Sequence, residues 1–390
     1  MTVRERIREQ PLPGEAEAAA RSWPVVEAAL AAEAPARRAR RPRRVALRLA
    51  LVAAALGVGL VAALTPAGAE VGDWIGDRFA DRADPAKPAF AELPPGASVL
   101  AISRSGAYAV HSKRSRRLGS FTEAGWSPRG LHVVGVDGHR VVAVDATGMQ
   151  KAGMQKWSVT RPGRVHHPAW STGDGFFVAY LEGSVLRTVG GDGAGDRPLR
   201  RHAAPVTPAW RPHAGHVLAY ARQRGGLEAV DVDSGLTLWR ATGQAALART
   251  RQLAWSRDGR RLVALSPREL TVLGADGRVL RTVALPAPAR QLALHPSGRR
   301  AAVVVAGGGG TRALDIPLNG GGTTRQLFQG DVDGLAWSRD GRRLLLAWRD
   351  ADQWLLLGPN GRVRRALHGV SDEIGAAGGF PRLAGWCCPG

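Results

Sequence analysis

A short phrase that recurs at nearly constant spacing constrains the fold of this chain more than any other feature. Its clearest copies, at 254–262 and 336–344, both read Ala-Trp-Ser-Arg-Asp-Gly-Arg-Arg-Leu. Six copies have their anchor positions at Trp126, Trp170, Trp210, Trp255, Leu294 and Trp337, which lie 44, 40, 45, 39 and 43 residues apart. A period of about 40–45 residues, with short apolar runs and turn signals, is typical of four-stranded propeller blades.

Each repeat contains enough apolar runs for one blade. After Trp255, short apolar runs cover 261–265, 270–273 and 279–283, and the last two are separated by Asp276-Gly277. Asp-Gly is favoured in tight hairpin turns, where the central residues need positive φ. With the strand that carries the tryptophan, the unit has four predicted strands.

The two ends of the repeat region are complementary. Residues 98–118 contain three predicted strands without a tryptophan strand before them, and residues 380–386 form a tryptophan strand without followers. Together they predict a composite blade that closes the ring and removes its open edges. The sequence therefore predicts an all-β, seven-bladed β-propeller over 97–390, with about 42 residues per blade.

The segment before the propeller predicts a membrane anchor. Residues 15–33 form a short predicted helix, an arginine cluster follows at 37–48, and 49–69 contain no charged residue. Twenty-one residues at a rise of about 1.5 Å suffice to cross a hydrocarbon core of roughly 30 Å. The positive-inside tendency predicts a cytoplasmic segment at 1–48, a transmembrane helix at 49–69, a juxtamembrane linker at 70–96 and an extracytoplasmic propeller. Cleavage after Ala67-Gly68-Ala69, as in a signal sequence, is an alternative.

The charge of the chain divides along the same boundary. Lys and Arg number 54 against 33 Asp and Glu, a formal net charge of +21, which first suggests nucleic-acid binding. Eleven Arg and six Glu lie in 1–48, whereas 70–390 hold 43 basic and 27 acidic residues. Because the larger excess falls outside the predicted membrane span, we expect no nucleic-acid partner. An anionic envelope ligand or an acidic protein is the expected partner.

One aligned column of the repeats gives a candidate ligand site. Three residues before each anchor, the column is mostly polar and includes Glu123, His167, Gln252 and Gln291. Side chains alternate along a strand, so these residues share a face with the small residue before the anchor. The column therefore predicts a polar ring at one mouth of the central channel, where a ligand or partner would bind. Alternatively, these are ordinary solvated residues at the start of an inner strand.

Other candidate sites are weak. His166-His167 and His213-x-x-His216 lack accompanying acids or cysteines, so we expect no metal site and no cofactor. Asp231-x-Asp233 resembles the start of a calcium loop but fits a hairpin turn better. The only two cysteines, Cys387 and Cys388, could form a disulfide with another chain, a strained ring with each other, or remain free.

The Trp-Ser-x-Asp-Gly-x-x-Leu phrase resembles the TolB-like, WD40-like β-propeller repeat of bacterial envelope proteins. The resemblance covers about three-quarters of the chain, and the whole layout also resembles single-span, membrane-anchored propeller proteins of GC-rich bacteria. It implies a non-catalytic protein-interaction or ligand-sensing module in the cell envelope. No hydrolase motif such as Gly-x-Ser-x-Gly or His-Glu-x-x-His occurs. A hydrolase or lyase acting on envelope glycan or peptide, with a site assembled from several blades, is the alternative.

Overall fold

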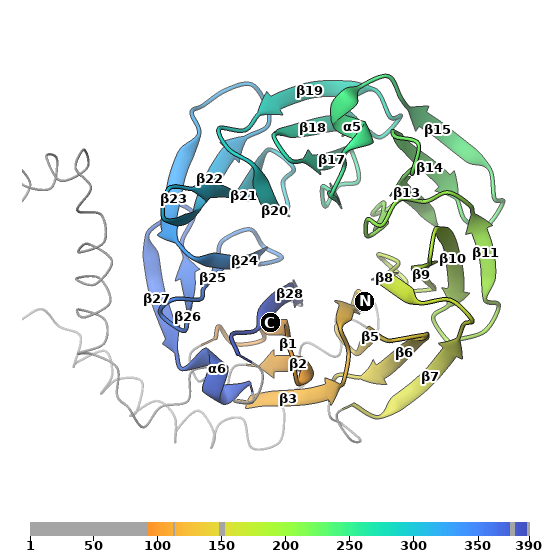
Figure 1. The fold of residues 1–390 in the computed structure, drawn as a ribbon, viewed down its shortest axis with the longest axis horizontal. Coiled ribbons are helices and arrows are strands. Elements are labelled where there is room, and N and C mark those ends of the chain that lie inside the picture. The colour runs from red at the N-terminus through yellow and green to blue at the C-terminus, as the bar shows by residue number, and fades with distance from the viewer. Residues whose placement is uncertain (1–92, 112–113, 148–152, 375–378, 388–390) are drawn as a thin grey trace, which may run out of the picture. The chain divides into compact units, whose positions relative to one another are not determined.

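A computed structural model describes residues 93–111, 114–147, 153–374 and 379–387 (Figure 1). The chain divides into two compact units, Met1–Val71 and Gly72–Gly390, and the described residues all belong to the second. The predicted cytoplasmic segment, the span at 49–69 and the linker up to residue 92 lie outside them. Among the described residues, no helix has the length and apolar character needed to cross a membrane.

The predicted seven-bladed all-β propeller is confirmed: the described residues form seven antiparallel sheets of four strands each. We number the blades in chain order. Blade 1 consists of β4 (Glu123–Trp126), β5 (His132–Asp137), β6 (Arg140–Asp145) and β7 (Gln155–Thr160). Blade 2 consists of β8 (Val165–Trp170), β9 (Phe177–Glu182), β10 (Val185–Gly190) and β11 (Arg197–Arg200). Blade 3 consists of β12 (Ala209–Trp210), β13 (Val217–Ala221), β14 (Leu227–Asp231) and β15 (Thr237–Ala241).

The second half of the ring repeats this plan. Blade 4 consists of β16 (Gln252–Trp255), β17 (Arg261–Ser266), β18 (Glu269–Gly274) and β19 (Val279–Ala284). Blade 5 consists of β20 (Ala289–Leu294), β21 (Arg300–Gly307), β22 (Gly310–Pro317) and β23 (Arg325–Gly330). Blade 6 consists of β24 (Val332–Trp337), β25 (Leu344–Trp348), β26 (Gln353–Leu357) and β27 (Val363–His368). Two short helices, α5 (Ala245–Ala248) and α6 (Val370–Glu373), lie in the connections after blades 3 and 6.

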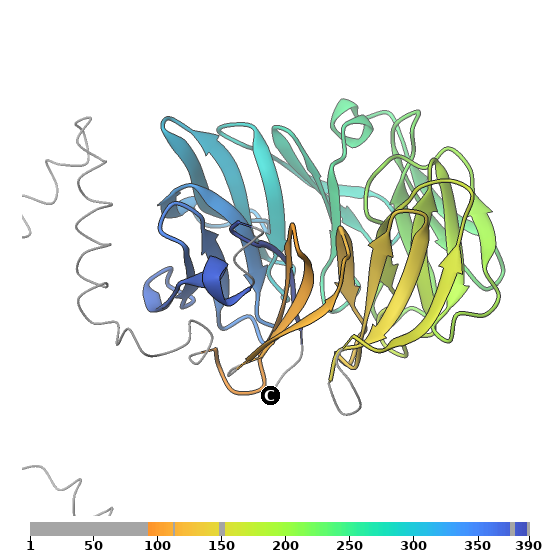
Figure 2. The same ribbon diagram turned by 60° about the horizontal axis from the view of Figure 1, so that its bottom comes forward.

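Blade 7 is the predicted composite blade. It consists of β28 (Arg382–Cys387), β1 (Ser98–Ser103), β2 (Gly106–His111) and β3 (Arg114–Gly119). Strand β28 pairs antiparallel with β1, so Leu100 lies opposite Gly385 and Ser98 opposite Cys387. Figures 1 and 2 show β28 in blue beside the orange strands β1 and β2, although the two ends are far apart in sequence. The pairing closes the ring and gives β1 a partner on its inner side, so β1 is not left as an exposed edge.

The hydrophobic cores lie between neighbouring blades. Between blades 4 and 5, for example, Val263 and Leu265 of β17 share a buried cluster with Val303 and Val305 of β21. These runs alternate with residues that face the opposite neighbour, as pleated strands require. Every blade therefore depends on both neighbours for burial of its two faces.

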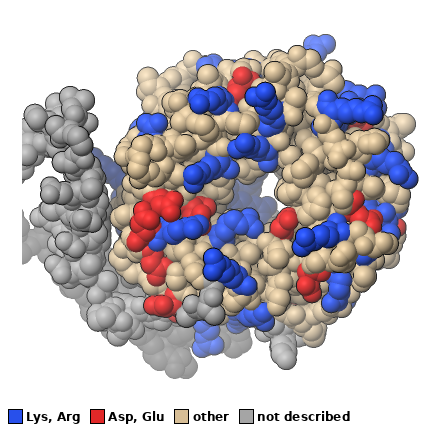
Figure 3. Space-filling model, viewed as in Figure 1, with Lys and Arg blue, Asp and Glu red and all other residues tan. Residues whose placement is uncertain are grey.

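Antiparallel strands alternate in direction, so the loops fall on two faces of the ring. The turns between first and second strands, and those between third and fourth strands, lie on one face, which we call the turn face. The connections between blades and the turns between second and third strands lie on the other, which we call the crossover face. Figure 3 views the molecule from the crossover face.

Candidate functional site

The inner strands surround a cavity of about 620 Å³ in the central channel. Small residues that precede the anchors, including Ala293, Ala336 and Gly385, line its wall. Gln252 and Gln291 of the predicted polar column line it as well. Glu123 and His167 are not among its lining residues. The structure thus separates the four predicted ligand-site residues into two groups.

The two glutamines make hydrogen bonds between blades. The amide of Gln252 accepts from the backbone N–H of Leu292 and donates to its carbonyl oxygen, both at 2.8 Å. Gln291 repeats this toward Leu335 of the next blade, with an accepting distance of 3.0 Å and a donating distance of 3.5 Å. Each side-chain amide therefore pairs with the backbone of the next inner strand as a neighbouring strand would, and it joins the two blades. A ligand role for these residues stays a prediction.

Replacing Gln252 with alanine should lower the free energy of unfolding by about 1–3 kcal/mol, because both polar backbone groups of Leu292 lose their side-chain partner. Urea denaturation measures the change. Gln252→Glu is the matched control, because it keeps the acceptor for the Leu292 N–H but cannot donate to the carbonyl. We expect it to be at least as unstable as Gln252→Ala, because a carboxylate oxygen would face the carbonyl oxygen of Leu292. Equal stability of all three proteins would show that the hydrogen bonds between Gln252 and Leu292 contribute nothing to the stability of the fold.

Glu123 and His167 form the second group. The carboxylate of Glu123 accepts from the backbone N–H of His167 at 2.6 Å and lies 3.5 Å from its Nδ1. The imidazole also contacts Thr207 Oγ1 at 3.1 Å. His167 has a φ of 57°, which is uncommon for a residue other than glycine. Burial lowers the pKa of His167 more than neighbouring Glu123 raises it. Polar side chains of blades 1, 2 and 3 thus meet near the crossover face.

Three of the anchor tryptophans make connections in the opposite direction, toward the previous blade. The indole N–H groups of Trp210, Trp255 and Trp337 donate to Ala169, Ala209 and Ala293, respectively, at 3.0–3.1 Å. Each acceptor is the small residue that precedes the anchor of the previous blade. These three indoles therefore connect neighbouring blades. Two anchors differ. The indole N–H of Trp170 donates to the carbonyl oxygen of Gly175 in its own blade at 2.6 Å, and the buried indole N–H of Trp126 has no partner among the described residues.

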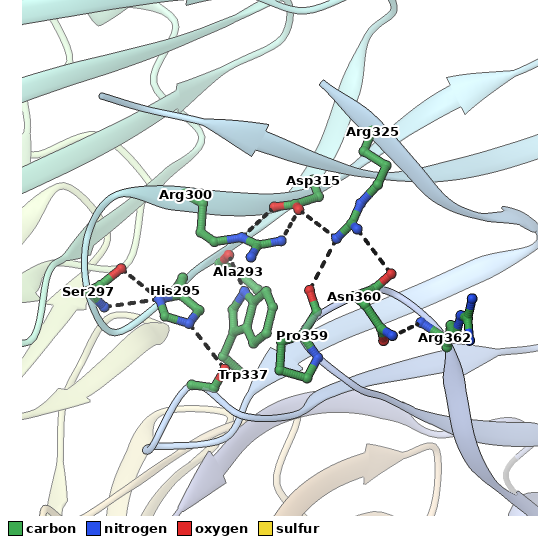
Figure 4. Close-up of polar contacts among 11 residues, drawn as sticks. Ala293, His295, Ser297, Arg300, Asp315, Arg325, Trp337, Pro359, Asn360 and Arg362 are labelled. Atoms are coloured by element: carbon green, nitrogen blue, oxygen red, sulfur yellow. Dashed lines mark hydrogen bonds and ion pairs between the residues drawn. The ribbon is translucent and has the colours of Figure 1, made fainter. Parts of the chain in front are cut away.

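Figure 4 shows one of these blade junctions in detail. Trp337 lies edge-on to His295, whose Nε2 is 3.1 Å from the carbonyl oxygen of Gly341. Beside them Asp315 accepts hydrogen bonds from both Arg300 and Arg325. Arg300, Asp315 and Arg325 line a cavity of about 520 Å³, which Pro359 of blade 6 also borders. The charges here are largely satisfied within the protein, so the junction is mainly structural.

The turn-face mouth of the channel carries two arginines. Arg257 and Arg339 line the channel cavity, and Arg257 Nη1 lies 3.4 Å from the carbonyl oxygen of Arg339. Neither guanidinium has a carboxylate partner within the described part of the chain. The neighbouring Asp258 is held by Ser256 Oγ at 2.6 Å, and that bond keeps the pKa of Asp258 below its usual range. The mouth is therefore positively charged.

Exposed aromatic and acidic groups cluster on the turn face of blades 2 and 3. The ring of Phe176 stacks on His216 with centroids 5.5 Å apart. His216 Nδ1 lies 2.7 Å from Asp233 and its Nε2 lies 3.0 Å from Asp174, so the charged imidazolium can donate to both carboxylates. Burial lowers the pKa of His216. The hydrogen bonds and charges of Asp233 and Asp174 raise that pKa by more, so the net pKa lies above the ordinary value for histidine. The histidine thus joins two blades.

We expect the contribution of His216 to stability to decrease as the pH rises. A histidine whose pKa is raised in the folded state stabilises the fold fully at a pH below its pKa in the unfolded chain, which is about 6.5. This stabilisation is lost as the pH rises through the pKa of the folded state. The difference in unfolding free energy between wild type and His216→Asn should therefore be largest near pH 6 and shrink toward about pH 8.5. Histidines with lowered pKa, such as His132 and His295, cancel in this difference. A difference that grows with pH would contradict the assignment.

The remaining predicted sites have simple structural positions. Asp231 Oδ1 accepts from the backbone and hydroxyl of Ser234, both at 2.8 Å, as expected for a hairpin turn. Within the described ranges, no group of three or more His, Cys, Asp or Glu side chains could hold a metal ion. Cys387 ends β28 and is buried. Cys388 lies outside the described residues, so the disulfide stays a prediction.

Comparison with known proteins supports the fold only. No family model matches the chain, and no curated protein matches it. The β-propeller domain of Myceliophteria thermophila Cps50 (Swd1) is similar, with a TM-score of 0.51, 17% identity, and coverage of 65% of this chain and 88% of that one. A chain of the Mitotic Checkpoint Complex has a TM-score of 0.52, 18% identity, and coverage of 63% and 77%.

A third similar structure is a candidate 6-phosphogluconolactonase from Bacteroides uniformis. Its TM-score is 0.53 and its identity 14%, with coverage of 70% of this chain and 96% of that one. These likenesses agree with the β-propeller fold of this chain. At such low identity they show the shared fold and nothing about activity.

Proposed function

We propose that this chain is a membrane-anchored, extracytoplasmic β-propeller that acts as a non-catalytic protein-interaction or ligand-sensing module of the cell envelope. In this proposal residues 49–69 hold the propeller at the membrane, and its turn face docks a protein partner. The TolB-like repeat phrase and the uncharged segment after the arginine cluster support the location. The charge excess of residues 70–390 favours a partner with acidic groups.

The observation that carries the proposal is the position of the exposed large apolar side chains. Phe176, Leu236 and Leu280 are 59%, 65% and 59% exposed, and Leu131 and Leu238 are also exposed. All five lie in turns or strand ends on the turn face of blades 1 to 4. Exposed apolar side chains on one face, which also carries Arg257 and Arg339 at the channel mouth, are typical of a protein-binding surface.

Crosslinking and affinity purification of the full chain from its native envelope test the proposal. The Phe176→Asp/Leu236→Asp variant should lose specific partners that the wild type recovers, because two carboxylates are placed in the apolar surface. His139→Asp/Thr160→Asp, two exposed positions toward the crossover face, is the charge-matched control and should recover the same partners as wild type. Unchanged recovery with the turn-face variant would show that this face is not the docking surface.

The location is tested separately. A membrane-impermeant protease added to intact spheroplasts should digest the propeller and leave residues 1–48 protected. Protection of the propeller would place it in the cytoplasm and overturn the envelope part of the proposal. The hydrolase or lyase alternative has no specific observation in its favour, since the similarity to the candidate lactonase concerns the fold alone.

A further inference from the structure

A pocket between blades 2 and 3 is lined by more positively charged than negatively charged side chains. The pocket has a volume of about 160 Å³ and opens near the crossover face. Its charged lining residues are Arg200, Arg201, Arg222, Arg224, Arg240 and Glu228. Five guanidinium groups thus surround a single carboxylate. Figure 3 shows Lys and Arg side chains gathered at the upper right of this face, over the blade that contains β13 to β15.

Glu228 on β14 is the fixed centre of the pocket. It is 2% exposed and accepts from Arg240 Nε at 2.8 Å, Thr237 Oγ1 at 2.9 Å and Arg200 Nε at 3.2 Å. Burial raises the pKa of Glu228, but the hydrogen bonds from Arg240, Thr237 and Arg200 outweigh it and hold the pKa below its usual range. The carboxylate therefore stays charged and orients the guanidinium groups around it.

All three guanidinium nitrogens of Arg200 donate hydrogen bonds within the protein. Besides Glu228, it donates to the backbone carbonyls of Leu199 and Gly235. This arginine therefore joins β11 of blade 2 to blade 3 and has a structural role.

The other arginines keep donors available. Arg240 and Arg222 contact Glu228 through Nε, at 2.8 Å and 3.8 Å, and no partner is found for their Nη groups among the described residues. Arg201 and Arg224 make no ion pair or side-chain hydrogen bond within the same part of the chain. Like charges this close repel one another, so an anion that accepts from several of them at once is strongly favoured.

We propose that this pocket, which we call the arginine pocket, binds a phosphate group, with the free donors of Arg201, Arg222, Arg224 and Arg240 around its oxygens. A guanidinium matches two phosphate oxygens at once, and a phosphate has more acceptor oxygens than a carboxylate. The small volume admits the phosphate group itself and leaves the rest of the ligand outside. The site does not depend on the apolar docking surface, which lies on the turn face.

Titration calorimetry on the purified full chain in detergent, at constant ionic strength, tests the arginine pocket with inorganic phosphate, glycerol 1-phosphate and dimethyl phosphate. We expect phosphate to bind in excess over chloride. Arg201→Ala/Arg224→Ala should weaken binding about tenfold or more, because two charge-assisted contacts are lost. Stronger binding of glycerol 1-phosphate than of dimethyl phosphate would identify a monoester ligand. Equal binding would show that the pocket also accepts a diester, as in a polymer backbone or a lipid headgroup.

The matched control is Arg249→Ala/Arg251→Ala, which removes two exposed arginines outside the pocket and changes the net charge equally. It should bind phosphate as the wild type does. Comparable weakening in both double variants would mean nonspecific attraction and would overturn the proposal. Absence of phosphate binding by folded wild type would also overturn it. Circular dichroism identifies any variant that fails to fold, and Arg224→Ala alone then serves as the milder test.

Discussion

Replacing Trp337 with alanine is expected to lower the free energy of unfolding by about 3–5 kcal/mol, the usual cost of removing a buried tryptophan. Its indole is 9% exposed and packs in a core with Leu335, Leu346 and Ala293. Alanine would also leave the carbonyl of Ala293 without the indole N–H that bonds it at 3.1 Å. Guanidinium denaturation, with circular dichroism as the signal, measures the change.

Two comparisons separate the causes of this loss. Trp255 makes an equivalent 3.1 Å bond to Ala209 but is only partly buried, so Trp255→Ala should cost less than Trp337→Ala. Trp337→Phe keeps an aromatic ring and removes the donor, so we expect a loss of about 1–3 kcal/mol. Equal losses for the two alanine variants would mean that the hydrogen bond, and not burial, dominates.

The fold could be predicted because its determinants are local and repeated. A tryptophan, a Ser-Arg-Asp-Gly turn and the following apolar run each specify a strand or a turn within a few residues. In the structure Ser256 Oγ and Asp258 hold that turn by short hydrogen bonds, and Ser338 and Asp340 do the same. The degenerate copy at 293–298 lacks the tryptophan but keeps the small residue, the turn glycine and the spacing, and its Leu294 ends the inner strand of blade 5 as expected.

The candidate sites were less predictable because they depend on contacts between blades. Alignment of the repeats showed that Gln252 and Gln291 are polar and share a face with small residues. It could not show that their amides reach the backbone of the next blade, 40 and 44 residues further along. The column therefore predicted the position of the glutamines in the channel and missed their structural bonds.

The arginine pocket had no sequence signal strong enough to find it. Arg200, Arg222 and Arg240 come from separate segments, in a chain that is rich in arginine throughout. Only Glu228 stands out, as an acid within the otherwise apolar run 227–230. An isolated acid in a predicted buried strand is expected to have a partner, and that rule could have directed attention to this blade.

Removing β28 should have the largest effect of all, because the ring would lose the strand that closes it. A variant that ends at Gly379 lacks Leu383, which is 3% exposed, and also Phe380 and Trp386, which pack against the same core. A fully buried large apolar side chain contributes about 1.5–3 kcal/mol, so the loss is up to about 9 kcal/mol, with Phe380 and Trp386 contributing less than their full share because they are partly buried. The backbone pairing between β28 and β1 would be lost as well.

A loss of this size is comparable with the total stability of a typical domain, about 5–15 kcal/mol. The truncated chain should therefore show no cooperative unfolding transition at 25 °C, and its β1 edge should make it aggregate. A synthetic peptide of residues 380–390, added during refolding, should restore the transition, because it supplies the missing strand. Cooperative unfolding of the truncated chain at an unchanged denaturant midpoint would show that six blades are stable without closure. Recovery with the peptide, and not with a scrambled peptide of the same composition, would show that the β28–β1 pairing itself makes the propeller a single cooperative unit.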